Sequence, residues 1–275
     1  MSSIETPSGK NETTENFPVE KLVSPKYRAH VKAFYVFARA ADDISDNPML
    51  TAAEKIARLD HFDKALMDDN DQSVSSILPL RNSLKFTGVT PQHARDLLIA
   101  FKQDATKLRY ENWQELLDYC RYSAAPVGRY LLDLHGEDQS AWAANDALCA
   151  VLQIINHIQD CANDYRMLDR VYIPLDMMAA NGASVNDLAS SVSTPALRAT
   201  LTTMLNEMEP LLTLAQTFPK QIRDPRLRFD TAVIATIAKR LDKVLRTRDP
   251  LCDFVKLTRR QKMTAMATGF IRTWI

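Results

Sequence analysis

Residues 151–165 read Val151-Leu-Gln-Ile-Ile-Asn-His-Ile-Gln-Asp-Cys-Ala-Asn-Asp-Tyr165, and this segment sets the architecture expected of the whole chain. An apolar run that begins at Trp142 leads into it, so the pattern predicts one long helix. At about 100° per residue, four polar side chains fall on one stripe of that helix. They are Gln153, Asn156, Asp160 and Asp164. Isoleucine and leucine cover most of the remaining surface, which indicates that the helix is buried.

The two carboxylates of this stripe need an explanation. A buried carboxylate costs free energy unless it is paired or bound to a cation, and Asp160 and Asp164 also repel each other across one turn. Carboxylate and amide oxygens together favour a hard divalent ion, Mg²⁺ over Zn²⁺. The alternative is that both aspartates lie at the solvated end of the helix and bind nothing.

A second pair of the same kind lies near the start of the chain, in a helix predicted over residues 26–46 and stopped by Asn47-Pro48. Four side chains share one face of it: Tyr35, Arg39, Asp42 and Asp46. Its carboxylates gather at the helix C-terminus, where the macrodipole favours cations, so a bound metal would reverse an unfavourable arrangement. Arg39 can balance the charge or contact an anion. A solvated acidic helix end is the alternative.

Composition narrows the class of protein. The chain has 275 residues, a formal net charge of zero and 46% hydrophobic residues, which is enough for a sizeable core. Balanced charge and the lack of a basic, aromatic-interleaved patch argue against nucleic-acid binding. The 6 glycines form neither a dinucleotide nor a P-loop motif. Long periodic segments and few β-branched alternating runs predict an all-α protein.

Other features bear on location and domain organisation. The four cysteines form no CxxC pair, residues 1–15 contain no apolar signal region, and no run approaches a transmembrane helix, so a cytoplasmic protein is expected. Residues 1–15 read as a disordered tail, and residues 16–275 as one helical domain. Asn11 begins a glycosylation sequon, which we attribute to chance.

The remaining helices follow from caps and periodicity. They are predicted over residues 51–69, 76–85, from Thr90 onward, 113–135 with a kink at Pro126, 195–218, 226–246 and 257–275. The last of them either packs on the body or lies at a membrane surface. The loop over residues 165–174 carries two arginines and two tyrosines, and it either contacts phosphate or is a solvated surface loop.

Two Asp-x-x-x-Asp faces that meet across a bundle could hold two or three Mg²⁺ ions. Such a cluster is suited to binding a diphosphate and withdrawing it as a leaving group. The apolar helix faces suit a long apolar substrate, and aromatic faces can stabilise a carbocation. A di-iron helical bundle would need Glu-x-x-His motifs, which the chain lacks.

Over roughly residues 16–260 the chain resembles the squalene/phytoene synthases, members of the isoprenoid synthase fold. Four motifs carry the resemblance: Arg39-x-x-Asp42-Asp43-x-x-Asp46, Tyr119-Cys120 with Val127-Gly128, Gln153-x-x-Asn156-x-x-x-Asp160-x-x-x-Asp164, and Arg170-Val-Tyr172-Ile-Pro174. The resemblance implies a single-domain helical bundle with a central active-site cavity.

Within the family, three segments are most similar to the bacterial hydroxysqualene synthases of the hopanoid pathway: residues 15–19, 33–44 and 102–110. That resemblance implies conversion of presqualene diphosphate and water to hydroxysqualene and diphosphate. Mg²⁺ assists the loss of diphosphate, the cation rearranges and water captures it. No reductant is needed, which agrees with the absence of a nicotinamide motif, so NADPH is not expected.

The resemblance also implies roles for individual residues. The implied metal ligands are Asp42, Asp46, Asp160 and Asp164. The implied substrate-binding residues are Tyr35, Arg39, Gln153, Arg170, Tyr172, Asn16 and Phe17. The implied catalytic residues are Asp104, Tyr119 and Asn156, of which the last two are candidates to position the attacking water.

Three positions depart from the family pattern. Asn16 stands where relatives often have a diphosphate-contacting serine. His157 lies at the edge of the polar stripe, where relatives usually carry an apolar residue, and we interpret it as a core or helix-edge histidine. The segment 166–170 is one residue longer than usual and lacks the customary glycine, which leaves the roles of its arginines open.

Alternatives remain. A sister synthase that joins two prenyl diphosphates into presqualene diphosphate, squalene or phytoene would use the same carboxylates. A non-enzymatic assembly factor built on this fold would have lost its aspartates, and a membrane-surface protein would leave both acidic stripes unexplained. The expected partners are a prenyl diphosphate substrate and neighbouring hopanoid-pathway enzymes, with no nucleic acid. Peripheral contact with the inner face of the membrane depends on the last helix.

Overall fold

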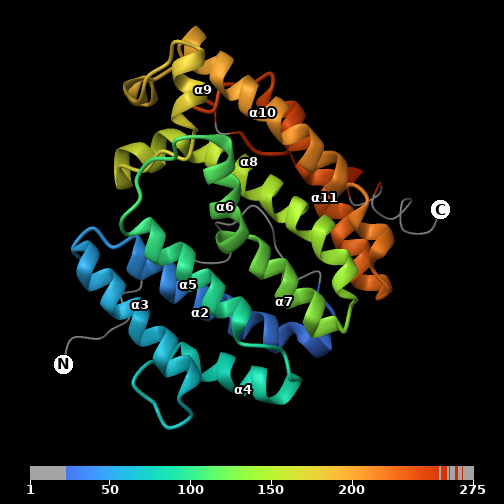
Figure 1. Cartoon of the computed structure of the whole chain (residues 1–275). Helices are drawn as coiled ribbons and strands as arrows, with labels where there is room; N and C mark the ends of the chain where they lie inside the picture. Colours follow the sequence, from blue (N-terminus) through green and yellow to red (C-terminus); the bar gives the residue numbers. More distant parts are fainter. Residues whose placement is uncertain (1–22, 254, 259, 261–263, 266–267, 269–275) are drawn as a thin grey trace. The chain divides into compact units, whose positions relative to one another are not determined.

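The computed structural model describes residues 23–253, 255–258, 260, 264, 265 and 268. Within these residues it contains helices and no β-strand, and its one isolated β-bridge joins Arg109 to Val171 (Figure 1). The predicted all-α class is therefore confirmed. The predicted disordered tail, residues 1–15, lies outside the described residues.

The helices form two compact units. The first comprises residues 1–107 and 126–137, and the second comprises residues 108–125 and 138–275. The chain therefore crosses from one unit to the other three times. The single domain expected over residues 16–275 stays a prediction.

The first unit is built on a long helix, α2 (Pro25–Ser45). Around it pack α3 (Ala52–Met67), α4 (Ile77–Thr87) and α5 (Gln92–Asp104). Local sequence sets several of the boundaries. Pro25 occupies the first turn of α2, where its missing N–H costs nothing, and Thr51 and Glu54 form the predicted capping box of α3. Gly88 ends α4 in the left-handed conformation, with φ of 71°.

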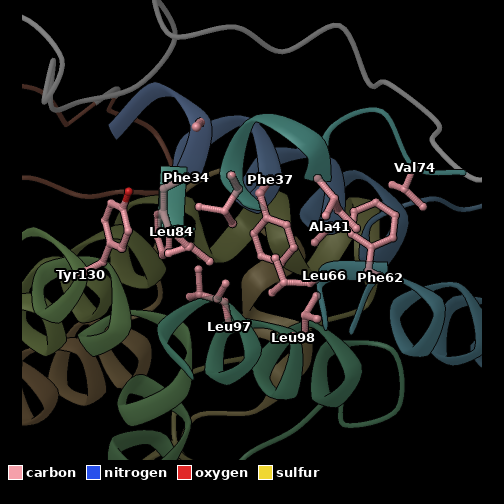
Figure 2. Close-up of a cluster of buried hydrophobic side chains, with 14 of the residues drawn as sticks. Phe34, Phe37, Ala41, Phe62, Leu66, Val74, Leu84, Leu97, Leu98 and Tyr130 are labelled. Atoms are coloured by element: carbon pink, nitrogen blue, oxygen red, sulfur yellow. The ribbon is translucent and has the colours of Figure 1, made fainter. Parts of the chain in front are cut away.

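Aromatic and leucine side chains fill the core of this unit (Figure 2). Phe37 of α2 and Phe62 of α3 are fully buried, with ring centroids 6.1 Å apart. The helix α7 (Ala125–His135) returns to the same core much later in the chain, because its Tyr130 stacks on Phe34 at 4.1 Å. Residues 126–137 therefore complete the first unit, although residues 108–125, which belong to the second unit, separate them from its first segment.

The second unit is organised around α8 (Trp142–Leu168), the long helix predicted from residues 142–165. It packs against α6 (Trp113–Ser123), α10 (Pro195–Ala215) and α11 (Pro225–Leu245). Its apolar positions are buried as expected: Val151, Ile154, Ile155 and Ile158. A short helix, α9 (Leu175–Ala180), and three 3₁₀ turns, η2 (Gln139–Ala141), η3 (Val185–Ala189) and η4 (Phe218–Gln221), complete the connections.

The prediction of a single kinked helix over residues 113–135 is wrong. The structure has two helices, α6 and α7, and the chain leaves helical geometry at Ala124, with φ of −126°. Pro126 is then the second residue of α7, a position where its missing N–H would have no partner in any case. The proline begins a helix here and does not bend one.

The helix predicted over residues 257–275 lies largely outside the described residues. Of the described ones, Ala265 is fully buried, and Arg240 of α11 donates to the hydroxyls of Thr264 at 2.5 Å and Thr268 at 3.3 Å. These contacts agree with packing on the body for this part of the segment. Among the described residues, no helix has the length and apolar character needed to cross a membrane.

Candidate active site

The last turn of α2 concentrates charge. Arg39 donates to Oδ1 of Asp43 from Nε at 3.0 Å and from Nη2 at 2.7 Å, and the same Nη2 lies 2.7 Å from Oδ2 of Asp42. Asp43 is buried, whereas Asp42 and Asp46 are half-exposed. No basic residue occupies the last turn of the helix. One guanidinium thus faces three carboxylates at a helix end that already favours cations.

This imbalance is visible at Arg39. Burial opposes the charged form of its guanidinium, but the carboxylates of Asp42, Asp43 and Asp46 outweigh burial and raise the pKa of Arg39. The turn as a whole keeps an excess of negative charge. Its oxygen donors and its charge fit a hard divalent cation.

The polar stripe of α8 has the predicted order but is more exposed than expected. Gln153, Asn156 and Asp164 are half-buried and Asp160 is exposed, while the side of α8 that carries Ile154, Ile155 and Ile158 is buried. Because Asp160 is exposed, burial alone does not require a cation at its carboxylate. Its place one turn before Asp164, near the C-terminal end of α8, resembles that of Asp42 and Asp46 on α2.

Four aromatic rings gather beside this stripe in the second unit, and they come from α6, from α8 and from the loops that precede α6 and follow α8. They are Tyr110, Tyr119, His157 and Tyr172, all buried. The ring centroids of Tyr119 and Tyr172 are 5.4 Å apart, and Tyr110 lies 5.4 Å from Tyr119 and 5.5 Å from Tyr172. We call these four residues the aromatic wall. Ring faces of this kind can contact an apolar or cationic group.

His157 joins the aromatic wall to the acidic stripe. Its ring stacks on Tyr172 at 3.6 Å, and its Nδ1 lies 4.0 Å from Oδ2 of Asp164. The residue is 7% exposed, and its Nε2 has no hydrogen-bond partner among the described residues. The interpretation of His157 as a core residue is confirmed, and its core is the aromatic wall itself.

The structure brings some of the predicted site residues together within each unit. In the second unit, Tyr119 and Tyr172 share the aromatic wall, and Gln153, Asn156, Asp160 and Asp164 follow one helix. In the first unit, Tyr35, Arg39 and Asp42 lie on α2, Asp46 caps its C-terminus, and Asp104 is the buried last residue of α5. Arg170 is 5% exposed, so it is no solvated surface arginine. Asn16 and Phe17 lie outside the described residues.

Within the described residues, no three histidine, cysteine, aspartate or glutamate side chains form a ready-made metal cluster. The acidic pairs belong to different units, and each pair offers two carboxylates. The assignment of Asp42, Asp46, Asp160 and Asp164 as metal ligands stays a prediction.

Cysteine chemistry has little support. Cys120 and Cys161 are buried, and burial raises the pKa of each thiol to about 12. A thiol with so high a pKa is a poor nucleophile at neutral pH. Both cysteines pack as small apolar residues.

Sequence reasoning missed Tyr110. Its ring is 1% exposed and contacts both Tyr119 and Tyr172. The signal was present in residues 102–110, which resemble a family segment, but nothing in a single sequence indicates that residues 110, 119 and 172 converge.

Comparisons with known proteins identify the same family as the sequence motifs. A model of the squalene/phytoene synthase family matches residues 11–266. A hydroxysqualene synthase of Rhodopseudomonas palustris is 46% identical over 93% of this chain and 88% of its own. One from Sinorhizobium fredii is 44% identical over 89% of this chain and 84% of its own.

Solved structures agree on the fold. A squalene synthase from Alicyclobacillus acidocaldarius superimposes with a TM-score of 0.74 at 25% identity, covering 83% of this chain and 86% of its own. A dehydrosqualene synthase solved with a ligand has a TM-score of 0.80 at 22% identity, covering 95% of this chain and 92% of its own. Its identity is low enough that it supports the fold alone.

Proposed function

Because the chain belongs to the squalene/phytoene synthase family, we propose that it is a hydroxysqualene synthase acting on presqualene diphosphate. The observation that carries the proposal is its similarity, over nearly the whole chain, to two proteins with that name. The chain also matches phytoene synthases, but at 30% identity or less and over about 61% of its length. A phytoene synthase activity is therefore less well supported.

The reaction is an ionisation followed by hydration. The carbon–oxygen bond to diphosphate breaks, and diphosphate leaves with the electron pair. The cyclopropylcarbinyl cation that remains rearranges, and the oxygen of a water molecule attacks it and releases a proton. The product is hydroxysqualene, and no electrons are exchanged with a cofactor.

The acidic helix ends would hold the metal that the family implies. The half-exposed carboxylates of Asp42, Asp46 and Asp164 and the exposed carboxylate of Asp160 supply only oxygen donors, which fits Mg²⁺. When bound there, divalent cations supply positive charge that stabilises the departing diphosphate. Arg39, which carries its charge at any working pH, would add a fixed positive charge for the same anion.

The aromatic wall would serve the organic part of the substrate. The ring faces of Tyr119 and Tyr172 can stabilise positive charge as it moves along the carbon skeleton. Their burial would keep bulk water away from the cation, so that one positioned water can react. Asn156, half-buried on the same helix as His157, and Tyr119 are the side chains that we propose position this water.

Product analysis tests the proposal. Purified protein with Mg²⁺ and without NADPH is given presqualene diphosphate in one reaction and farnesyl diphosphate in another, and products are identified by gas chromatography and mass spectrometry. We expect hydroxysqualene from the first reaction and no turnover in the second. Formation of presqualene diphosphate or phytoene-type products from a prenyl diphosphate would overturn the proposal in favour of the sister activity.

A further inference from the structure

The end of α8 has an unusual conformation. Asp169 has φ of 52° and ψ of 29°, and within the described residues no other residue except glycine has a positive φ. Its N–H donates to the carbonyl of Tyr165 at 3.1 Å, and the N–H of Arg170 donates to the carbonyl of Asp164 at 3.1 Å. The first of these bonds is the one that closes an αL helix end, in which the left-handed position normally holds glycine. Aspartate adopts this conformation more readily than most residues, but at a cost that glycine does not have.

Arg109 holds it. From a segment 60 residues earlier, Nη1 of Arg109 donates to the backbone carbonyl of Asp169, and Nη2 donates to Oδ1 of the Asp169 carboxylate at 2.5 Å. The guanidinium thus binds both the backbone and the side chain of one residue. The Asp169 side chain is 61% exposed, so the ion pair alone contributes little to stability. Its effect is to fix a backbone conformation.

The fixed backbone leads directly into site residues. Immediately after Asp169, the N–H of Val171 donates to the carbonyl of Leu108 at 2.9 Å, and that of Leu175 donates to the carbonyl of Tyr110 at 2.9 Å. Arg170 lies between Asp169 and Val171, Tyr172 lies between Val171 and Leu175, and both are buried. The pairing of residues 108–111 with residues 171–176 therefore begins at the contact between Arg109 and Asp169.

We propose that Arg109 and Asp169 are positioning residues for the reaction. Together they form a clasp that holds Arg170 and Tyr172, and the turn of α8 containing Asp164, in their working places. The clasp does the work of a glycine at the helix end, and in addition ties that end to the segment carrying Tyr110. Its catalytic consequence rests on the proposed function, whereas its structural consequence does not.

A double-mutant cycle tests the clasp, because glycine tolerates the left-handed conformation without help. Arg109→Ala should lower kcat/KM for presqualene diphosphate about tenfold, since small displacements of positioning groups cost rate steeply. Asp169→Gly should stay within about threefold of the unmodified protein, and adding Arg109→Ala to it should cost less than about threefold more. Equal losses from Arg109→Ala in both backgrounds, or no loss in either, would overturn the proposal.

Hydrogen exchange gives a second readout that needs no substrate. In Arg109→Ala the amides of Val171 and Leu175 should exchange faster, and in the double variant they should regain most of their protection. Unchanged exchange in Arg109→Ala would overturn the clasp, whereas a protein with the expected exchange but no activity on presqualene diphosphate would overturn the proposed function alone.

Two further variants complete the design. Arg223→Ala removes another exposed ion pair of the second unit, 3.2 Å from Asp138, and should change neither kcat nor the exchange of these amides. If Arg109→Ala does not fold, Arg109→Lys replaces it, because a lysine keeps the charge without the forked donors. If Arg109 only stabilised the fold, Arg109→Ala would lower the melting temperature and leave kcat unchanged.

Discussion

At the scale of single residues, charge is distributed against the preference of the helices that carry it. Arg39 neutralises part of the acidic turn of α2, where Asp42, Asp43 and Asp46 lie at the helix C-terminus. Helix dipoles disfavour such an arrangement, and a bound cation would stabilise it. The contribution of each carboxylate to binding and to stability can therefore be separated by mutation.

Removing one carboxylate from either acidic pair should abolish Mg²⁺-dependent turnover. We expect Asp42→Asn and Asp160→Asn each to lower kcat by at least about a hundredfold, because the leaving group loses stabilisation in the transition state. Circular dichroism should show unchanged helicity. The matched control is Asp69→Asn, which removes an exposed carboxylate paired with Lys85. Activity equal to that of the control in either variant would contradict the assignment.

Asp230 of α11 gives a stability that depends on pH. The side chain is 5% exposed, its Oδ2 has no hydrogen-bond partner among the described residues, and burial raises its pKa to about 7, with Arg226 opposing and Asp224 adding to the shift. The protonated form therefore contributes stability that is complete below the unfolded pKa of about 4. This stability is lost as the pH rises through about 7.

Asp230→Asn should remove that dependence. The free energy of unfolding of the unmodified protein should fall relative to the variant between pH 4 and 7, by up to about 1.4 kcal/mol per pH unit. Urea unfolding at several pH values measures the difference, and Asp69→Asn again serves as the control. Parallel curves for the unmodified protein and Asp230→Asn would show that the carboxyl titrates normally.

At the scale of elements, periodicity and caps predicted most helices, because the signals involved are local. The apolar spacing of α8 and the capping box of Thr51 and Glu54 lie within a few residues of the structure that they specify. Signals that depend on distant partners were missed. Tyr172 stacks on Tyr110, and Arg109 binds Asp169. The members of each pair are about 60 residues apart, so no local window of sequence contains both.

Substitutions of two prolines test the boundary between α6 and α7, which the sequence did not predict. Pro126 lies in the first turn of α7, whereas Pro210 lies exposed inside α10. Pro126→Ala should change the free energy of unfolding by less than about 1 kcal/mol, and Pro210→Ala should raise it by roughly 1–3 kcal/mol, since only an interior proline removes a helical hydrogen bond. A comparable gain from both would mean that Pro126 interrupts a continuous helix. Urea denaturation of both variants distinguishes the cases.

At the scale of the whole molecule, the chain builds its two units from interleaved segments. Residues 126–137 return to the unit formed by residues 1–107, after residues 108–125 have contributed to the other. Composition predicted an all-α protein, and the resemblance predicted the family, but neither indicated this interleaving. The interleaving depends on which distant segments share a core, and no local sequence pattern indicates which segments these are.

Tyr130 measures how far the returning segment supports the first unit. Its ring stacks on Phe34 and is 1% exposed, and its hydroxyl donates to the carbonyl of His30 at 3.1 Å. Tyr130→Ala should lower the free energy of unfolding by about 3–5 kcal/mol through lost packing. Tyr130→Phe keeps the ring and should cost only about 1 kcal/mol. A small effect of Tyr130→Ala would show that the first unit is stable without α7.

The central claim is that water captures a cation formed from presqualene diphosphate. The most direct measurement supplies this substrate and Mg²⁺, without NADPH, in water enriched in heavy oxygen, and determines the isotope content of the product by mass spectrometry. We predict hydroxysqualene carrying one heavy oxygen atom from the solvent. Hydroxysqualene without the label, or no hydroxysqualene from a protein that instead condenses farnesyl diphosphate, would contradict the claim.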